Sequence, residues 1–217
     1  RIHAFLDTHN VTLYLDTTGE PLFKRGLRKQ TGEAPLRENL AAGILRLSGW
    51  SPGIPLLDPM CGSGTFLLEA ALISLNIAPG AQRHFAFEKL NNFDARSWKQ
   101  LSDQSIKRQK PKVSLPIYGS DLYGNALDTT RANLAAAGLE GTVQLKQANI
   151  LEISAPARQG ILVANPPYGE RVGESEALAE FYPRLGDALK KKFSGWNCYI
   201  FSSDMRLPKL IRLNASK

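Results

Sequence analysis

The chain has 217 residues, of which 43% are hydrophobic and 22% are charged. This length provides for one domain with a sizeable core and a short arm but hardly for two full domains, and the composition excludes a wholly disordered chain, a collagen and a long coiled coil. The net charge of +7 at pH 7 makes a nucleic acid a favoured partner, although a solvated basic surface without a ligand explains the charge equally well.

The first predicted element is a small β-hairpin. Apolar side chains alternate with polar ones at Val11, Leu13 and Leu15, which is typical of a strand. Residues 17–20, Thr-Thr-Gly-Glu, have turn chemistry, and residues 22–25, Leu-Phe-Lys-Arg, are the expected return strand.

An amphipathic helix is expected after the hairpin. Its apolar residues recur at helical spacing, at Leu36, Leu40, Ile44 and Leu47. This helix should stop at the break formed by Ser51-Pro52-Gly53. We therefore assign residues 1–53 to an N-terminal arm of hairpin and lead-in helix.

From residue 54 onward, short apolar runs alternate with helical stretches. Strands are predicted near 54–58, 115–120, 142–147, 160–164 and 197–202, and helices near 64–76, 125–137 and 177–193. This alternation predicts parallel βαβ units and a doubly wound, Rossmann-like α/β sheet, in which ligands bind beyond the carboxyl ends of the strands. Residues 77–114 interrupt the pattern, and we interpret them as a helical insertion that caps this ligand-binding end.

The first candidate site follows the strand that ends at Asp58. The residues after it are Pro59, Met60, Cys61, Gly62, Ser63, Gly64 and Thr65. The two glycines permit a tight turn and close approach to a ligand, and a helix begins directly afterwards. Leu67 occupies the position of the third glycine in a dinucleotide fingerprint, and the Lys of a phosphate-binding P-loop is missing. The loop is therefore suited to a ligand whose positively charged or amino group meets Asp58, and a purely structural turn is the alternative.

The second candidate site is Asp121, which ends the apolar run of residues 117–120. Its carboxylate could accept hydrogen bonds from both hydroxyls of a ribose. A carboxylate in this position is equally common as the N-cap of the next helix, and that interpretation stays open.

The third candidate site is Asn165-Pro166-Pro167-Tyr168, directly after the buried run of residues 161–164. Two prolines fix φ and remove two backbone donors, so the carbonyls and the Asn165 side-chain oxygen are rigid acceptors suited to an NH₂ group. Gripping both hydrogens of a base amine favours a nitrogen aimed at an electrophile, and Tyr168 offers a face for stacking the base. An Asn-Pro turn that merely closes a strand is the alternative.

Two of these motifs together resemble a known family. Asp-Pro-Met-Cys-Gly-Ser-Gly-Thr at 58–65 and Asn-Pro-Pro-Tyr-Gly-Glu-Arg at 165–171 are similar to motifs of the S-adenosylmethionine-dependent RNA methyltransferases that accompany THUMP RNA-binding domains. The resemblance is greatest to bacterial enzymes that methylate N2 of a guanine in 23S ribosomal RNA. It extends to the lead-in at 34–38 and to the insertion at 78–98, whereas Asn-Pro-Pro-Tyr alone also occurs in adenine-N6 DNA methylases and glutamine-N5 protein methylases.

The resemblance implies a class I methyltransferase domain over residues 54–217 that binds S-adenosylmethionine. Residues 58–65 would line the methionine end of this cofactor, Asp121 would hold its ribose, and residues 165–168 would hold the target amine. Asn149 stands where the family usually has an acid that accepts from the adenine amino group, and its amide oxygen can still accept. The implied partner is RNA, either 23S rRNA or a ribosomal precursor.

Other functions stay open at this point. An adenine-N6 DNA methyltransferase would use the same site on a different base, and a non-catalytic RNA-binding module could keep the fold without turnover. Basic residues near 107–112, 190–192 and 24–29 are candidate contacts to an RNA backbone, with a solvated surface as the alternative.

Several features of the whole sequence limit its class further. It has no apolar run long enough for a transmembrane helix, and residues 1–4 lack a signal-peptide pattern. Cys61 and Cys198 are too few for a disulfide scaffold and have no metal-ligand spacing. We therefore expect a soluble, cytoplasmic protein without a metal site. Because the chain begins without methionine and ends at residues 214–217, Asn-Ala-Ser-Lys, we also expect a fragment truncated at both ends.

Overall fold

A five-stranded parallel sheet forms the centre of the protein, in a computed structural model that describes residues 1–25, 36–166, 174–202, 204 and 206–214. Its strands are β3 (Leu56–Asp58), β4 (Ile117–Asp121), β5 (Gln144–Gln147), β6 (Gly160–Ala164) and β7 (Trp196–Ile200). Their order in space is β5-β4-β3-β6-β7, so the chain first builds outward from β3 and then returns to its other side. This reversal is the switch point of a doubly wound sheet, which confirms the predicted fold class.

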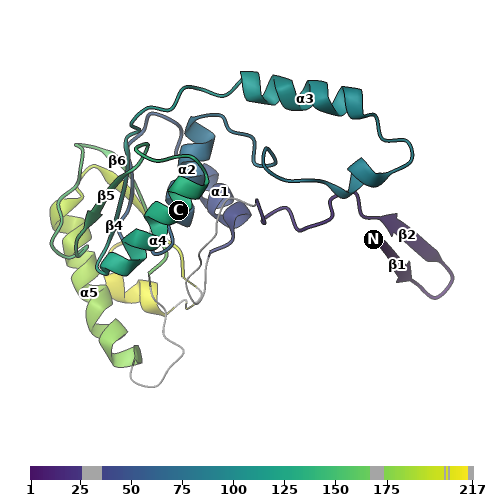
Figure 1. The fold of residues 1–217 in the computed structure, drawn as a ribbon. Coiled ribbons are helices and arrows are strands. Elements are labelled where there is room, and N and C mark those ends of the chain that lie inside the picture. Colours follow the sequence, from purple (N-terminus) through teal and green to yellow (C-terminus); the bar gives the residue numbers. More distant parts are fainter. Residues whose placement is uncertain (26–35, 167–173, 203, 205, 215–217) are drawn as a thin grey trace.

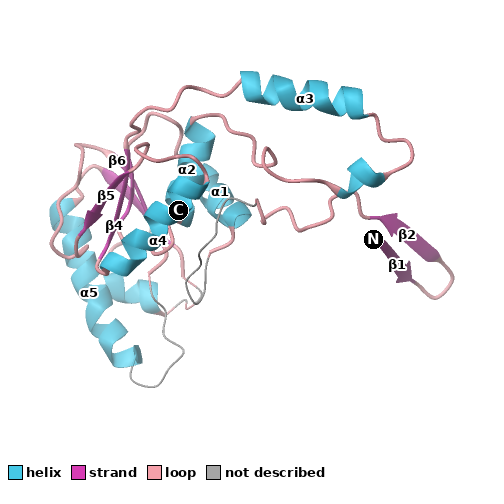
Figure 2. Cartoon of the chain, in the orientation of Figure 1, coloured by secondary structure: helices cyan, strands magenta, loops and turns pink. Residues whose placement is uncertain are grey.

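Helices cover both faces of the sheet. They are α1 (Glu38–Leu47), α2 (Thr65–Ser74), α4 (Gly124–Ala136) and α5 (Glu174–Lys192), with a short 3-10 helix, η2 (Leu207–Ile211). Successive residues of a strand point to opposite faces, so Leu56 packs with α1, α2 and α4 while Leu57 packs with α5 and η2. In Figure 2 the magenta strands accordingly lie between α4 and α5. In the part of the chain that the structure describes, no helix has the length and apolar character to cross a membrane.

The N-terminal hairpin forms, but with a different strand from the one predicted. β2 (Val11–Leu15) pairs with β1 (Ile2–Leu6), which precedes it, and Figure 1 shows this pair standing apart from the sheet. The predicted return strand at 22–25 is wrong. The Asp16 carboxylate accepts from the backbone N–H groups of Thr18 and Gly19 at 2.9 and 3.1 Å and so turns the chain away from β2.

The insertion lies at the edge of the sheet opposite to the predicted one. It contains η1 (Ala86–Lys89) and α3 (Ala95–Lys107), and Figure 1 shows α3 apart from the sheet. Its base is fixed where α2 ends, because Lys110 N donates to Leu75 O at 2.9 Å and Asn76 Nδ2 donates to Arg108 O at 2.9 Å. A helix that follows a parallel strand runs back to the amino ends of the strands, so the insertion starts from the amino edge. The expected cap over the ligand-binding end is therefore wrong.

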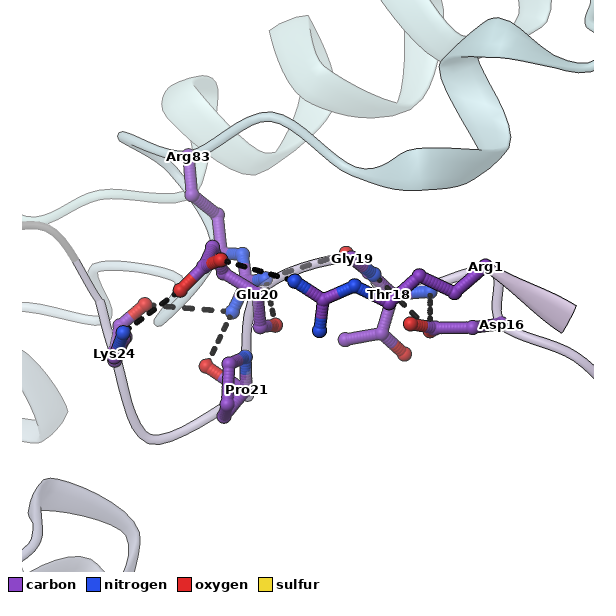
Figure 3. A network of polar contacts seen from close by, with 8 residues as sticks. All are labelled: Arg1, Asp16, Thr18, Gly19, Glu20, Pro21, Lys24 and Arg83. Atoms are coloured by element: carbon purple, nitrogen blue, oxygen red, sulfur yellow. Dashed lines mark hydrogen bonds and ion pairs between the residues drawn. The ribbon is translucent and has the colours of Figure 1, made fainter. Parts of the chain in front are cut away.

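The insertion also holds the turn that follows β2. The guanidinium of Arg83 donates to the carbonyl oxygens of Pro21 at 3.1 Å and Thr18 at 3.3 Å, and further to those of Glu20 and Lys24 (Figure 3). A planar guanidinium has five N–H donors and can serve several carbonyls at once. These hydrogen bonds therefore join the hairpin to the insertion.

Candidate functional site

The carboxyl ends of neighbouring strands bring the predicted site residues to one edge of the sheet. Asp58 ends β3, Asp121 ends β4, and Asn165 follows β6. β3 lies between β4 and β6 and is parallel to both, with Asp58 opposite Gly119. Asn149 comes after β5, the neighbour of β4. Residues far apart in the sequence thus share the edge at which doubly wound sheets bind ligands.

A tight loop of residues 59–64, which we call the glycine loop, joins β3 to α2, as predicted. Gly62 has φ 53° and Gly64 has φ 79°, in the left-handed region that favours glycine. Cys61 N donates to Ser120 O at 3.0 Å, and Gly64 N donates to Cys61 O at 2.7 Å. A Cβ on Gly62 would meet no atom of the described residues within 4 Å, so this side of the loop is open. The loop therefore offers the close backbone approach that a ligand requires.

Asp58 is a buried carboxyl at the base of this loop. Its side chain accepts from Met60 N at 3.3 Å, and the residue is 2% exposed. Burial, with a smaller contribution from the nearby Asp121, raises the pKa of Asp58 to about 8. A carboxyl in this state carries little charge at neutral pH by itself, and a cationic group placed beside it would favour its ionised form.

Cys61 is part of the same loop but is not a reactive thiol. Its side chain is buried, and burial raises the pKa of the thiol far above its ordinary value. The thiolate is the nucleophilic form of cysteine. Cys61 therefore contributes packing rather than nucleophilic chemistry.

Backbone N–H groups donate to both carboxylate oxygens of Asp121. Its Oδ2 accepts from Gly62 N at 2.9 Å and its Oδ1 from Tyr123 N at 3.1 Å. The N-cap of α4 is Tyr123, so the alternative of Asp121 as that N-cap is wrong. Each carboxylate oxygen has a second acceptor position, which leaves Asp121 able to accept from a ligand while it links β4 to the glycine loop.

Asn149 lies in a turn after β5. Its Oδ1 accepts from Leu151 N at 2.9 Å, so one of the two acceptor positions of this oxygen is in use. Asn149 also borders a cavity of about 1010 Å³ on the β4–β5 half of the sheet, together with Tyr118, Lys146 and Glu152. The sequence pattern did not predict this cavity, although the short connection between β5 and β6, without a predicted helix, was a signal for it.

Asn165 presents a buried acceptor at the carboxyl end of β6. Its Oδ1 is buried, and no residue in the described ranges hydrogen-bonds to it. The strand before it is held in place because Phe201 N donates to Ala164 O at 2.8 Å. Pro166 is buried as well, and Pro167 and Tyr168 lie outside the described residues. A buried oxygen without a donor costs about 1 to 3 kcal/mol, so a ligand that donates to it gains correspondingly.

Helix α4 contributes two site residues that the sequence analysis missed. Thr130 and Asn133 are buried and donate to carbonyl oxygens of the glycine loop. The available signal was their spacing, because two polar side chains three residues apart share one face of a helix that carries otherwise apolar core residues.

Comparison with known proteins places the chain among methyltransferases. Residues 25–217 match the family UPF0020, described as the RMKL-like methyltransferase domain. The slr0064 protein of Synechocystis sp., provisionally named an RNA methyltransferase, is 42% identical over 99% of this chain. The ribosomal RNA large subunit methyltransferase K/L of Shewanella sediminis is 40% identical over 100% of it. This chain spans 56% of the first relative and 31% of the second.

Solved structures agree with this fold. SMU.472, a provisionally named methyltransferase crystallised with S-adenosylhomocysteine (SAH), superposes with a TM-score of 0.91 at 36% identity and covers 100% of this chain. A Listeria monocytogenes protein described as a predicted N6-adenine-specific DNA methylase superposes with a TM-score of 0.90 at 33% identity over 100% of this chain. The chain covers 56% and 57% of these two structures, respectively.

Proposed function

The chain belongs to the family of RMKL-like methyltransferase domains, and from this membership and the geometry of its site we propose that it transfers a methyl group from S-adenosylmethionine to an exocyclic amine of a base in RNA. The target that we propose is N2 of a guanine in 23S rRNA or its precursor. Large-subunit ribosomal RNA is favoured as the substrate because the relatives include ribosomal RNA large subunit methyltransferases K/L. The net charge of +7 favours the same partner.

The residues at the carboxyl edge fit S-adenosylmethionine. In this proposal residues 58–65 line the methionine end of the cofactor, where Gly62 leaves open space and the Asp58 carboxyl can meet an ammonium group. Asp121 holds the ribose hydroxyls, and the remaining acceptor position of Asn149 receives the adenine amine. When bound, the cofactor supplies a methyl group on a sulfonium, which is already a good leaving group.

The single observation that carries the proposal is the unpaired, buried Oδ1 of Asn165. Among the described residues no donor reaches it, whereas the amine of a base brings two N–H groups. Asn165, with the carbonyl of Pro166, can therefore accept from this amine and orient its nitrogen toward the glycine loop on the neighbouring strand. Pro167 and Tyr168 complete the proposed amine and base contacts. A base in a duplex would first have to leave the stack to reach this edge.

An adenine-N6 DNA methyltransferase is the second candidate, because the Listeria protein with 33% identity is described as a DNA methylase of that type. Methyl incorporation from labelled S-adenosylmethionine into 23S rRNA and into duplex DNA, measured side by side, separates the two. We expect incorporation into rRNA. Incorporation into DNA alone would favour the second candidate. Retention of RNA without any SAH binding would favour a non-catalytic RNA-binding module.

Substitution of Asn165 tests the site itself. Asn165→Ala should abolish methyl transfer and leave SAH binding close to that of the wild type, because the change removes only the amine acceptor. Asp58→Ala should instead abolish SAH binding, measured by calorimetry. Asn197→Ala is the matched control, since Asn197 lies exposed on the adjacent β7. Methyl transfer by Asn165→Ala at the wild-type rate would exclude the assigned role.

The further assignments rest on the same proposal. We propose that residues 1–53 form an N-terminal arm and residues 54–217 the methyltransferase domain, with residues 77–114 as an insertion. We propose a cytoplasmic protein, as its bacterial rRNA-modifying relatives suggest. The basic segments 107–112 and 190–192 and Lys24 stay candidate RNA contacts. The prediction for Arg25 is wrong, because its side chain is buried and forms an ion pair with Glu69 at 2.8 Å. Arg28 and Lys29, proposed with them, lie outside the described residues.

A further inference from the structure

Helix α4 holds the glycine loop from the side opposite to the open edge. Thr130 Oγ1 donates to Gly62 O at 2.7 Å, and Asn133 Nδ2 donates to Ser63 O at 3.0 Å. Thr130 is 0% exposed and Asn133 is 1% exposed, so water does not compete for these bonds. Both donors come from one face of one helix, and their acceptors are consecutive carbonyls of the loop.

These bonds fix consecutive peptide planes. Gly62 N donates to Asp121 Oδ2, Gly62 O accepts from Thr130, and Ser63 O accepts from Asn133. A peptide unit is planar and trans, so its C=O and N–H point in opposite directions. Turning the Gly62 carbonyl toward α4 therefore turns the Ser63 N–H away from α4. This N–H has no partner among the described residues and is a donor for a ligand on that side.

Thr130 also fills the space behind the loop. A Cβ on Gly64 would lie 2.7 Å from Thr130 Cγ2 and 2.9 Å from its Oγ1, closer than real side-chain contacts permit. Cys61 Sγ lies 3.8 Å from Thr130 Oγ1. The loop thus has no room to move toward α4 and cannot move away without breaking two buried hydrogen bonds.

We propose that Thr130 and Asn133 are positioning residues for the cofactor, which hold the glycine loop in the shape that binds S-adenosylmethionine. The inference rests on the proposed function. α4 begins directly after the segment that carries Asp121, so one helix links the predicted ribose contact to the loop. A loop that is already in its bound shape binds without an ordering cost, and therefore more tightly.

The test compares two substitutions at one position. Thr130→Val keeps the shape and removes the hydroxyl, whereas Thr130→Ser keeps the hydroxyl and removes the methyl group. SAH affinity by calorimetry, well below the melting temperature, should fall about tenfold in Thr130→Val, equivalent to one buried hydrogen bond, and stay near wild type in Thr130→Ser. Both variants should melt earlier, because each loses packing or a bond. Thr129→Val on the same helix is the control, since Thr129 Oγ1 donates to the carbonyl of Asn125 within α4 and not to the glycine loop.

The kinetic readout distinguishes positioning from stability. In Thr130→Val, and in the second variant Asn133→Leu, KM for S-adenosylmethionine should rise while KM for RNA stays unchanged. Wild-type affinity for SAH in Thr130→Val, or equal loss in Thr130→Val and Thr130→Ser, would overturn the inference and leave the proposed function standing. Failure of the wild-type chain to bind SAH would overturn both.

Discussion

The buried carboxyl of Asp58 makes a sharp prediction about stability and pH. Its pKa is raised from 3.8 to about 8, chiefly by burial. Between these values the folded chain keeps a proton that the unfolded chain has lost, so the free energy of unfolding falls as pH rises. Each pH unit in this window removes about 1.4 kcal/mol, or about 3 kcal/mol between pH 5 and pH 7.

Asp58→Asn should remove this pH-dependent loss of stability. The amide is neutral at every pH, has the shape of the carboxyl, and its oxygen can still accept from Met60 N. We expect the variant to be nearly as stable as the wild type at about pH 4 and to exceed it by about 4 kcal/mol at pH 7, by urea unfolding. The difference between the two proteins cancels the other titrating groups. A difference that stays constant from pH 5 to pH 7 would refute the reasoning. The same variant should bind SAH more weakly, as expected where a strained group serves function.

Two further predictions concern the glycine loop and the contact between the hairpin and the insertion. Gly64→Ala should destabilise the protein by about 2 to 4 kcal/mol in chemical denaturation, because the added methyl would clash with Thr130 of α4 and alanine would have to adopt a left-handed φ. Gly62→Ala has only the unfavourable φ and should cost about 1 kcal/mol. Equal costs would argue against the close packing of α4. Arg83→Met removes the donors to the turn after β2, so amide hydrogen exchange should accelerate around residues 17–24 and in η1 while the central sheet stays protected. Unchanged exchange there would mean that contacts other than those of Arg83 hold this turn.

Periodicity and motif chemistry predicted most of the central domain. The five strands and three of the helices occupy the predicted segments, because alternation of apolar and helical runs is encoded within each segment. The same patterns placed Asp58 and Asp121 at the ends of strands and Asn165 directly after one, and parallel pairing then brings all three to one edge. Local rules were sufficient because each of these residues depends only on where its own strand ends.

The interpretation of individual groups needed the structure. Asp121 was equally compatible with a ribose contact or an N-cap, and only its bonds to Gly62 N and Tyr123 N exclude the N-cap. Likewise, the glycines were assigned to ligand approach. In the structure the two glycines differ. Gly62 faces open space, whereas Gly64 lacks a Cβ where Thr130 of α4 packs against the loop. Such distinctions depend on which side chain from a distant segment occupies the neighbouring space.

The amino-acid sequence by itself determined the α/β class, the order of strands and helices along the chain, and the two motifs that we propose for the cofactor and the amine. Only the tertiary structure decided that β2 pairs with residues 2–6, that the insertion stands at the amino edge, and that α4 braces the glycine loop. The physical reason is range. Side-chain periodicity and φ preferences act within a few residues, whereas strand pairing, helix packing and buried hydrogen bonds join segments that the chain brings together only on folding.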